Sequence, residues 1–196
     1  MANKNIEVDL SLLDVTGLAA EVPPVERSPV ESQWYVLWTR SNCEQLVYDQ
    51  LAFKGFELFL PRIGKWSRRD GSRHLARVPM FPGYLFLHHT MTKTSYIEVC
   101  KARGLVRILG ERWDRLGTIP KKEIWAIQRV LGADVPVTPH PYVREGQRVR
   151  ITQGPLADVE GIVVKPESKK GLFVLSIELL RKSVAVQVDG ALIVPA

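Results

Sequence analysis

The basic segment between positions 62 and 77 is the strongest candidate for a binding function in this sequence. Its six basic residues are Arg62, Lys65, Arg68, Arg69, Arg73 and Arg77, against the single acid Asp70, which leaves a net charge of six minus one. Because Asp70-Gly71 is typical of a tight turn, the segment predicts a projecting hairpin. Such a hairpin can follow nucleic-acid phosphates, with Trp66 as a stacking surface. The alternative is a solvated loop whose charge serves only solubility.

Metal, cofactor and enzyme chemistry find little support in the sequence. His88 and His89 are adjacent on a predicted strand, so their side chains should point to opposite faces and cannot hold one ion together. Cys43 and Cys100 show no zinc-site spacing. No Gly-x-Ser-x-Gly motif, P-loop or dinucleotide fingerprint is present. We therefore expect no metal, no cofactor and no catalysis.

The composition is that of a globular protein with an excess of positive charge. In 196 residues, Lys and Arg outnumber Asp and Glu by 27 to 21, giving a net charge of +6. This charge favours an anionic partner but is weak support alone. No apolar run approaches the roughly 18 residues that span a bilayer, and two cysteines make no disulfide framework. We expect a cytoplasmic protein without membrane contact.

Hydrophobic periodicity and turn residues divide the chain into four segments. Residues 1–32 are expected to be a flexible tail, with a short docking helix around Leu10, Leu12 and Leu13 as the alternative. Residues 33–132 predict a domain with the order β-α-β-β-α-β-α. Residues 133–142 contain three prolines and predict a stiff linker. Residues 143–196 predict about five short strands in a small β-barrel.

The irregular alternation in the first domain predicts an α+β fold, in which helices flank an antiparallel or mixed sheet. The predicted strands are 34–38, 56–60, 83–88 and 105–109. Two Ser-x-x-Glu capping boxes, at Ser41 and Ser95, are expected to open the first two helices. The third helix is expected to start near Pro120 and to present Ile124, Ile127 and Leu131 on one face.

A glycine-rich pattern near the C-terminus carries a family resemblance. Gly146, the Gly154-Pro155 pair and Gly161 permit the turns around short strands in Glu145-Gly146-Gln147-Arg148-Val149-Arg150-Ile151, Gly154-Pro155-Leu156-Ala157-Asp158 and Gly161-Ile162-Val163. This pattern resembles the KOW motif of the NusG and RfaH family of transcription factors. In the first domain, the segments similar to that family are Trp34-Tyr35-Val36, Met80-Phe81-Pro82-Gly83-Tyr84-Leu85-Phe86 and Arg103-Gly104.

The resemblance implies that the N-terminal domain holds the clamp helices of the largest subunit of RNA polymerase in an apolar pocket. The residues that match this pocket are Trp38, Phe81 and Ile124, with Tyr35 and Tyr84 nearby. Exposed aromatic residues on one sheet face also suit a partner helix on physical grounds. The alternative is that these side chains only fill the core. A polymerase adaptor requires Trp38 and Phe81 to be exposed, whereas an RNA-binding module requires them only as core.

The resemblance also implies contact with the non-template strand or the upstream duplex of DNA. The matching basic residues are Arg40, Arg103 and those of the hairpin, including Arg68, Arg69, Arg73 and Arg77. RfaH has a further His-Thr-Thr contact with the polymerase. Ser95-Tyr96-Ile97 stands at that place here, so this contact is not carried over.

The KOW barrel of the family binds the termination factor Rho or a small-subunit ribosomal protein, partly through a loop aromatic that Leu156 replaces here. The N-terminal tail and the Trp38-Thr39-Arg40 strand end resemble a specialised, RfaH-like paralogue more than the general factor. Because the barrel is rich in valine, we expect no switch to helices. The resemblance thus predicts a monomeric elongation and antitermination factor. The alternative is a ribosome-associated RNA-binding KOW protein.

Overall fold

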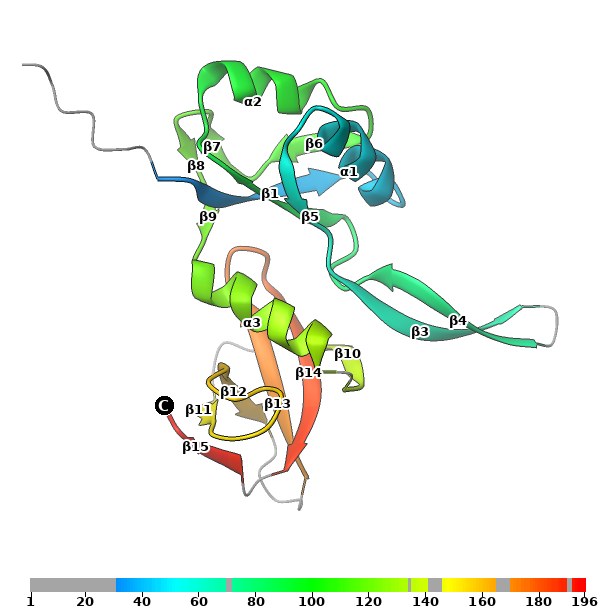
Figure 1. Cartoon of the computed structure of the whole chain (residues 1–196), viewed down its shortest axis with the longest axis vertical. Helices are drawn as coiled ribbons and strands as arrows, with labels where there is room; N and C mark the ends of the chain where they lie inside the picture. Colours follow the sequence, from blue (N-terminus) through cyan, green and yellow to red (C-terminus); the bar gives the residue numbers. More distant parts are fainter. Residues whose placement is uncertain (1–30, 70–71, 134, 141–145, 165–169, 190–191) are drawn as a thin grey trace, which may run out of the picture. The chain divides into compact units, whose positions relative to one another are not determined.

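The computed structural model describes residues 31–69, 72–133, 135–140, 146–164, 170–189 and 192–196 (Figure 1). Residues 1–30 of the predicted tail and the Asp70-Gly71 turn lie outside the described residues.

An antiparallel sheet forms the centre of the N-terminal domain. Its strands are β1 (Gln33–Thr39), β2 (Glu57–Phe59), β5 (Tyr84–His89), β6 (Leu105–Ile108) and β9 (Thr118–Ile119). The order is β2-β5-β1-β6, and β9 also pairs with β1. Every pairing in this sheet is antiparallel, which confirms the predicted α+β class. β1 is central, so its alternate side chains supply both faces of the sheet.

Two helices, α1 (Glu44–Phe53) and α2 (Lys93–Cys100), cover one face of this sheet (Figure 1). The core between them and the sheet contains Tyr35, Leu37, Leu85 and Leu87 from the strands. Val47 and Leu51 of α1 and Val99 of α2 complete this core, and all three are fully buried. Burial of each such side chain contributes about 1.5–3 kcal/mol.

The predicted capping boxes at Ser41 and Ser95 are wrong, although both helices exist. The N-cap of α1 is Cys43, and no side chain caps it. The capping box of α2 is formed by Thr92 and Ser95, with the Ser95 amide donating to Thr92 Oγ1 at 3.1 Å and the Thr92 amide donating to Ser95 Oγ at 2.8 Å. Since a serine can also serve as the third helical residue of such a box, α2 begins at Lys93.

Two hairpins leave the sheet. The predicted basic hairpin consists of β3 (Arg62–Arg69) and β4 (Ser72–Pro79), and it projects from the domain at the right of Figure 1. The second consists of β7 (Gly110–Arg112) and β8 (Arg115–Leu116). Strands of two or three residues are too short to show an alternating pattern, which is why the sequence did not predict β7, β8 or β9.

The third helix, α3 (Lys121–Gly132), follows Pro120 as predicted. Its residues Ile124, Ile127 and Val130 are buried in a second core, which also contains Val36 and Phe86 from the face of the sheet opposite α1 and α2. Leu131, predicted on the same face, is only partly buried. The apolar spacing of α3 therefore predicted its packing well.

The C-terminal region is an antiparallel sheet, and it contains the five predicted strands and one more. They are β10 (Val137–His140), β11 (Gln147–Ile151), β12 (Glu160–Val164), β13 (Lys170–Ile177), β14 (Lys182–Asp189) and β15 (Ile193–Pro195), in the order β10-β14-β13-β12-β11-β15. β10 comes from the predicted linker. It pairs with β14 at the sheet edge, where a proline such as Pro139 is tolerated. No helix in the described ranges has the length and apolarity to cross a bilayer.

Candidate functional site

A row of three side chains crosses the N-terminal sheet at the end of β1. In the strand register Trp38 lies opposite Tyr84 of β5 and opposite Arg107 of β6. Directly paired residues share one face of a sheet. The row is thus fixed by the backbone pairing of three strands, which is a rigid way to present side chains.

Trp38 is the accessible aromatic residue of this row, with 39% of its surface exposed. The guanidinium carbon of Arg107 lies 5.7 Å from the centre of its ring, a cation–π arrangement. The indole also lies over Gly83, because a Cβ built on that glycine would be 3.8 Å from the Trp38 ring. Trp38 is therefore held between a cation and a glycine while one part of the ring stays open to a partner.

The other predicted members of the polymerase pocket are buried. Phe81 is 1% exposed and Ile124 is 2% exposed. Phe81 packs edge-on against Phe86, with ring centroids 6.0 Å apart, and both Phe81 and Ile124 belong to the core that includes α3. The expectation that Phe81 is exposed on the sheet face is thus wrong for this conformation, because its ring fills the core beside Phe86.

Tyr35 cannot line the same pocket as Trp38. Residues three apart on a strand point to opposite faces, and Tyr35 packs in the core beneath α1 and α2. Burial raises the pKa of its hydroxyl, and a hydrogen bond with the backbone of Met91 opposes this shift. Tyr84, by contrast, is partly buried against the other core, on the side of Trp38. The prediction grouped the two tyrosines, but the alternation of β1 separates Tyr35 from this face.

The end of β1 is tied to two loops that carry the motif residues. The backbone amide of Thr39 donates to the carbonyl of Gly83 at 2.8 Å, and the amide of Arg40 donates to the carbonyl of Gly104 at 2.8 Å. Arg40 and Arg103 are both exposed. Their backbones therefore meet at one corner of the domain, as the predicted nucleic-acid contact requires.

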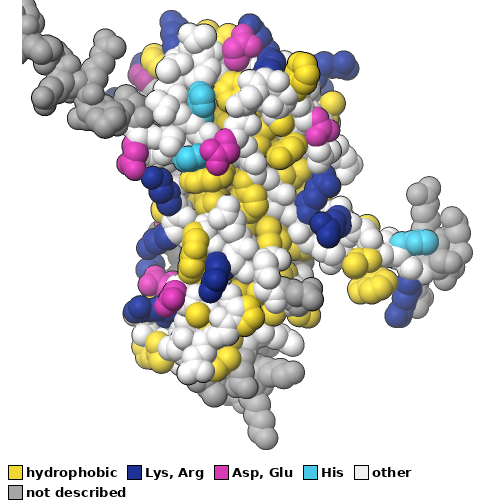
Figure 2. All heavy atoms as spheres, in the orientation of Figure 1, with side chains coloured by type: hydrophobic (Ala, Val, Ile, Leu, Met, Phe, Trp, Pro, Cys, Tyr) yellow, Lys and Arg dark blue, Asp and Glu magenta, His cyan; other side chains and the backbone are white. Residues whose placement is uncertain are grey.

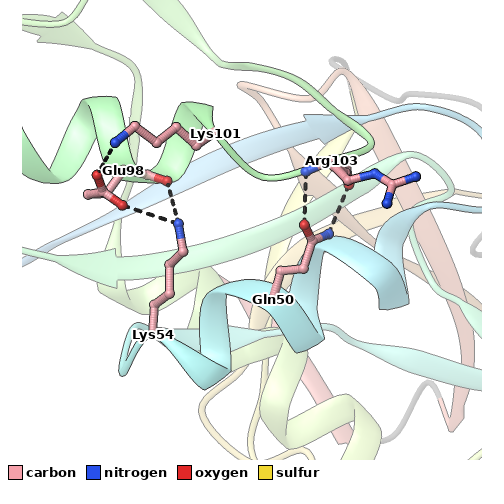
Figure 3. Close-up of polar contacts among 5 residues, drawn as sticks. All are labelled: Gln50, Lys54, Glu98, Lys101 and Arg103. Atoms are coloured by element: carbon pink, nitrogen blue, oxygen red, sulfur yellow. Dashed lines mark hydrogen bonds and ion pairs between the residues drawn. The ribbon is translucent and has the colours of Figure 1, made fainter.

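Gln50 of α1 holds the backbone of Arg103 from the other side. Its side-chain amide donates to the Arg103 carbonyl at 3.0 Å and accepts from the Arg103 amide at 3.0 Å. Figure 3 shows both bonds, with the guanidinium group of Arg103 directed away from Gln50. Because both the amide and the carbonyl of Arg103 are hydrogen-bonded, the backbone position from which its side chain extends is fixed. No sequence pattern predicted this role, because Gln50 is 53 residues from Arg103.

An ion-pair cluster joins α1 to α2 beside this corner. Glu98 pairs with Lys101 and, at 3.2 Å, with Lys54 (Figure 3). These two cations lower the pKa of Glu98, and the hydrogen bond with Lys101 contributes most. Because the cluster is exposed, its contribution to stability is small. Its two lysines share their charge with Glu98, so they add less positive charge to this corner than their number suggests.

The basic hairpin residues whose side chains the structure describes are exposed, and none of them forms an ion pair with a described acidic residue. Arg62, Lys65, Arg73 and Arg77 all lie at the surface. The Arg62 guanidinium donates to the side-chain oxygen of Gln45 in α1, which holds the base of the hairpin against the domain. Among the described residues, no ion pair involves these four side chains. The backbone of Arg68 and Arg69 lies in β3, close to the tip.

His88 and His89 point to opposite faces, as the alternation predicted. His88 stacks on Trp34 with ring centroids 4.7 Å apart, and its Nδ1 lies 2.7 Å from Glu57 Oε2. His89 packs edge-on against Phe56. Burial lowers the pKa of His89, and the neighbouring His88 adds to this shift. Both rings thus have packing roles on separate faces.

Leu156, the predicted partner contact of the barrel, is 4% exposed. It follows Gly154-Pro155 in a turn closed by a bond from the Ala157 amide to the Gly154 carbonyl at 3.0 Å. The turn directs Leu156 into the core with Val159, which is fully buried. Burial of a leucine side chain contributes about 1.5–3 kcal/mol, so Leu156 anchors this loop to the core instead of forming an open contact.

The sequence missed Arg107 as a member of the row. Arg107 lies in the predicted 105–109 strand, two residues from the core residue Leu105. A charged residue within an otherwise largely apolar strand could have indicated that Arg107 lies on an exposed part of the sheet face. The pairing of Arg107 with Trp38 was not visible, because it depends on the register between two strands that are far apart in the sequence.

Comparisons with known proteins agree on one family. Residues 32–128 match the family described as "Transcription termination factor nusG". The chain is similar to the transcription termination/antitermination protein NusG of Escherichia coli O6:H1, with 28% identity over 170 residues, covering 81% of this chain and 93% of that protein. It is 24% identical over 169 residues to the protein of the same name from Buchnera aphidicola subsp. Acyrthosiphon pisum, with the same coverage of both chains.

The fold is similar to a solved structure described as "Domain interaction in Thermotoga maritima NusG". The TM-score is 0.52 at 20% identity, and the match covers 83% of this chain and 96% of that one. The likeness therefore includes the C-terminal strands as well as the N-terminal sheet.

Proposed function

We propose that this chain, which belongs to the NusG family of transcription termination and antitermination factors, binds RNA polymerase through its N-terminal domain and recruits a second partner through its C-terminal barrel. The family consists of transcription factors and not of enzymes. The proposed place of action is the cytoplasm, where the chain acts as a monomer on the elongating polymerase.

The exposed Trp38 carries the polymerase contact in this proposal. A tryptophan held in a rigid row, with a cation over one part of its ring, has the properties of an interface anchor. The partner is a helix of the largest subunit of the polymerase, whose apolar side chains pack on the indole. In this proposal, the guanidinium group of Arg107 forms an ion pair with an acidic residue of that helix. Phe81 and Ile124 contribute only if the packing around them opens, since both are buried here.

The basic corner and the hairpin supply the proposed DNA contact. Arg40 and Arg103 lie together, with backbones fixed by Gly104 and Gln50. Exposed arginines at fixed positions bind phosphates by charge and by paired hydrogen bonds. We assign the non-template strand or the upstream duplex to this surface, with the net charge of +6 favouring the approach of an anionic partner.

The proposed partner of the barrel is Rho or a small-subunit ribosomal protein. Leu156 reaches such a partner only after its loop rearranges, because the side chain is buried. For this reason the barrel contact in this chain depends on other residues or on a loop change. The tail and the strand end around Trp38 support a specialised paralogue.

The competing function is a ribosome-associated RNA-binding protein, and the burial of Phe81 is the observation that favours it. Binding to purified RNA polymerase in gel filtration separates the two functions. We expect wild type to co-elute with the polymerase and Trp38→Ala to elute separately. The matched control is Trp125→Ala, because Trp125 is 41% exposed and lies 5.3 Å from the guanidinium carbon of Arg129. Failure of wild type to bind, or equal loss in both variants, would refute the polymerase contact through Trp38.

A further inference from the structure

A cavity of about 520 Å³ is lined by residues of α3 and of the barrel strands β12 and β13. Its volume is within the range of about 300–1,000 Å³ that is typical of small-molecule sites. α3 packs against β13 within one compact unit, Glu31–Ala196. The described lining residues do not include Trp38, the basic corner or the basic hairpin, so the cavity has no part in the contacts proposed above.

The floor of the cavity is the outer face of the barrel sheet. Ile162 of β12 pairs with Val174 of β13, so their side chains lie on one face. The neighbouring residues Val163 and Phe173 point to the opposite face, into the barrel core. Val174 is fully buried and Ile162 is half-buried. Together with Ala126 of α3, these side chains give the cavity an apolar floor.

Trp125 of α3 supplies an aromatic wall, and 41% of its surface is exposed. The same side chain lines a second hollow, together with Arg129. The guanidinium carbon of Arg129 lies 5.3 Å from the centre of the Trp125 ring. The indole therefore stands between the two hollows, with a cation on the side of the second one. A further cation in the first cavity can use the remaining open surface of the ring.

The charged residues of the lining have an excess of negative charge, although the chain has a net charge of +6. Four carboxylates stand against two cations, which leaves a net charge of two minus four. Among the residues that the structure describes, none of these carboxylates forms an ion pair. On the face shown in Figure 2, acidic side chains lie beside basic and apolar ones at the lower left. The acids of the lining are Glu123, Asp158, Glu160 and Glu178, and the cations are Lys122 and Arg148.

Two of the carboxylates, from different elements, lie close enough to repel each other. Glu123 is in the first turn of α3, and Glu178 directly follows β13. Burial raises the pKa of the Glu123 carboxyl, and the charge of Glu178 raises it further, while Lys122 opposes this shift. A cation that enters beside this pair replaces a repulsion with two attractions.

We propose that this cavity binds an organic polyamine, whose ammonium groups pair with the carboxylates of Glu123 and Glu178 and whose methylene chain packs on Trp125 and the apolar floor. The excess of two carboxylates favours a ligand with at least two ammonium groups. A metal ion fits less well, because no group of three acidic, His or Cys side chains in the described ranges could hold one. An alkylammonium ion needs no such cluster, since separate carboxylates and an aromatic ring can share its charge.

Isothermal titration calorimetry of the full chain with spermidine tests this site. We expect one saturable site, because the positive net charge of the chain disfavours polyamine binding elsewhere. Glu123→Gln and Glu178→Gln should each weaken the affinity about two- to fivefold, the effect of one lost ion pair. Trp125→Leu keeps an apolar side chain and should weaken the affinity about 2- to 30-fold, the effect of one lost cation–π contact.

The matched control is Glu111→Gln, which removes an exposed carboxylate of β7 outside the cavity and should leave the affinity unchanged. The double variant Glu123→Gln/Glu178→Gln should bind spermidine about 4- to 25-fold more weakly than wild type, the product of the two single effects. Circular dichroism verifies the fold of each variant. Because Glu178 is exposed, Glu178→Gln should keep the fold and tests the site by itself.

Thermal unfolding at pH 7 separates ligand binding from a structural role of Glu123. Without spermidine, Glu123→Gln should unfold at a higher temperature than wild type, because the replacement removes a repelled carboxylate. Spermidine should raise the midpoint of wild type by binding the folded state, and it should raise the midpoint of the double variant much less. Magnesium chloride at equal ionic strength controls for screening of charge and should raise the wild-type midpoint less than spermidine does.

Three results would overturn this site. The first is a wild type that shows no saturable binding of spermidine. The second is an equal affinity in wild type and the double variant, or an equal loss in the double variant and Glu111→Gln, which would leave only diffuse surface charge. The third is an equal rise of the wild-type midpoint with magnesium chloride and with spermidine. Polymerase binding in gel filtration is a separate result that none of these outcomes changes.

Discussion

The side-chain carboxylate of Glu44, in the first turn of α1, accepts a hydrogen bond from the backbone amide of Gly83 at 2.6 Å. Glu44 is 5% exposed, so this bond lies away from water. Gly83 precedes β5 and also accepts the bond from Thr39 that closes the end of β1. Glu44 therefore fixes the loop on which the indole of Trp38 rests, and connects α1 to the proposed polymerase contact.

Replacement of Glu44 should destabilise the domain. Glu44→Ala leaves the partly buried Gly83 amide without its acceptor, and we expect a loss of about 1–3 kcal/mol in the free energy of unfolding. Glu44→Gln keeps an acceptor oxygen and should lose less. Urea unfolding of the two variants and of Phe53→Ala, a residue of the same helix that is 94% exposed, measures these changes. A Glu44→Ala variant as stable as Phe53→Ala would contradict the role of this bond.

The Gly104 position should not tolerate a side chain. Its φ is +93°, and an added Cβ would lie 2.8 Å from Cys43 Cβ. Both the left-handed backbone and the close approach penalise alanine, so we expect Gly104→Ala to lose more than about 1 kcal/mol of stability. Gly132→Ala is the control, because no atom lies within 4 Å of a Cβ there. Thermal unfolding should show a clearly lower midpoint only for Gly104→Ala.

Gln50 should act through Arg103 in the proposed DNA contact. Loss of the two bonds from Gln50 frees the Arg103 backbone, so Gln50→Ala should remove part of the contribution of Arg103 to binding of a polymerase–DNA complex. The double variant should then bind no more weakly than Arg103→Ala alone, which a double-mutant cycle measures. Lys54→Ala, which removes the contacts of Lys54 with the carboxylate and the backbone carbonyl of Glu98, serves as the control. Additive effects of Gln50→Ala and Arg103→Ala would exclude this coupling.

Glu123 of α3 should make stability fall as the pH rises. Burial raises the pKa of its carboxyl, and Glu178 raises it further, while Lys122 opposes the shift. A carboxyl whose pKa is higher in the folded state binds more protons there, so stability decreases between the unfolded and folded pKa values. Glu123→Gln should thus be more stable than wild type at pH 7, and the difference should vanish below about pH 4. Unfolding at several pH values measures this, with the exposed Glu111→Gln as control.

An unchanged difference between wild type and Glu123→Gln across that pH range would mean that packing, and not ionisation, determines the effect. A wild type more stable than the variant at pH 7 would contradict the direction of the pKa shift.

Much of the fold was predictable because its signals are local. The apolar spacing of Ile124 and Ile127 predicted α3, Pro120 predicted its start, and the alternation of valines predicted the barrel strands. The helix starts were less predictable. Ser41 and Ser95 both fit a capping box, but the competition between Thr92 and Ser95 for the cap depends on one hydrogen-bond pair that the sequence pattern does not specify.

The candidate site was predictable only where residues lie on one element. Trp38 and the hairpin arginines could be proposed as contact residues from their own segments, and these assignments stay predictions. The burial of Phe81 and of Leu156, the separation of Tyr35 from Trp38, and the contact of Gln50 with Arg103 all depend on contacts between distant segments. The separation of Tyr35 from Trp38 could have been predicted from the sequence, because side chains alternate along a strand and positions 35 and 38 differ by an odd number.

The most direct test of the central claim is a crosslink from position 38. Replacing Trp38 by the photoreactive residue p-benzoylphenylalanine keeps an aromatic side chain at the proposed contact, and the same replacement of Trp125 provides the control. In a reconstituted elongation complex, we predict that position 38 crosslinks to the largest subunit of RNA polymerase and that position 125 does so much less. No crosslink from position 38 to the largest subunit, or equal crosslinking from both positions, would contradict the claim.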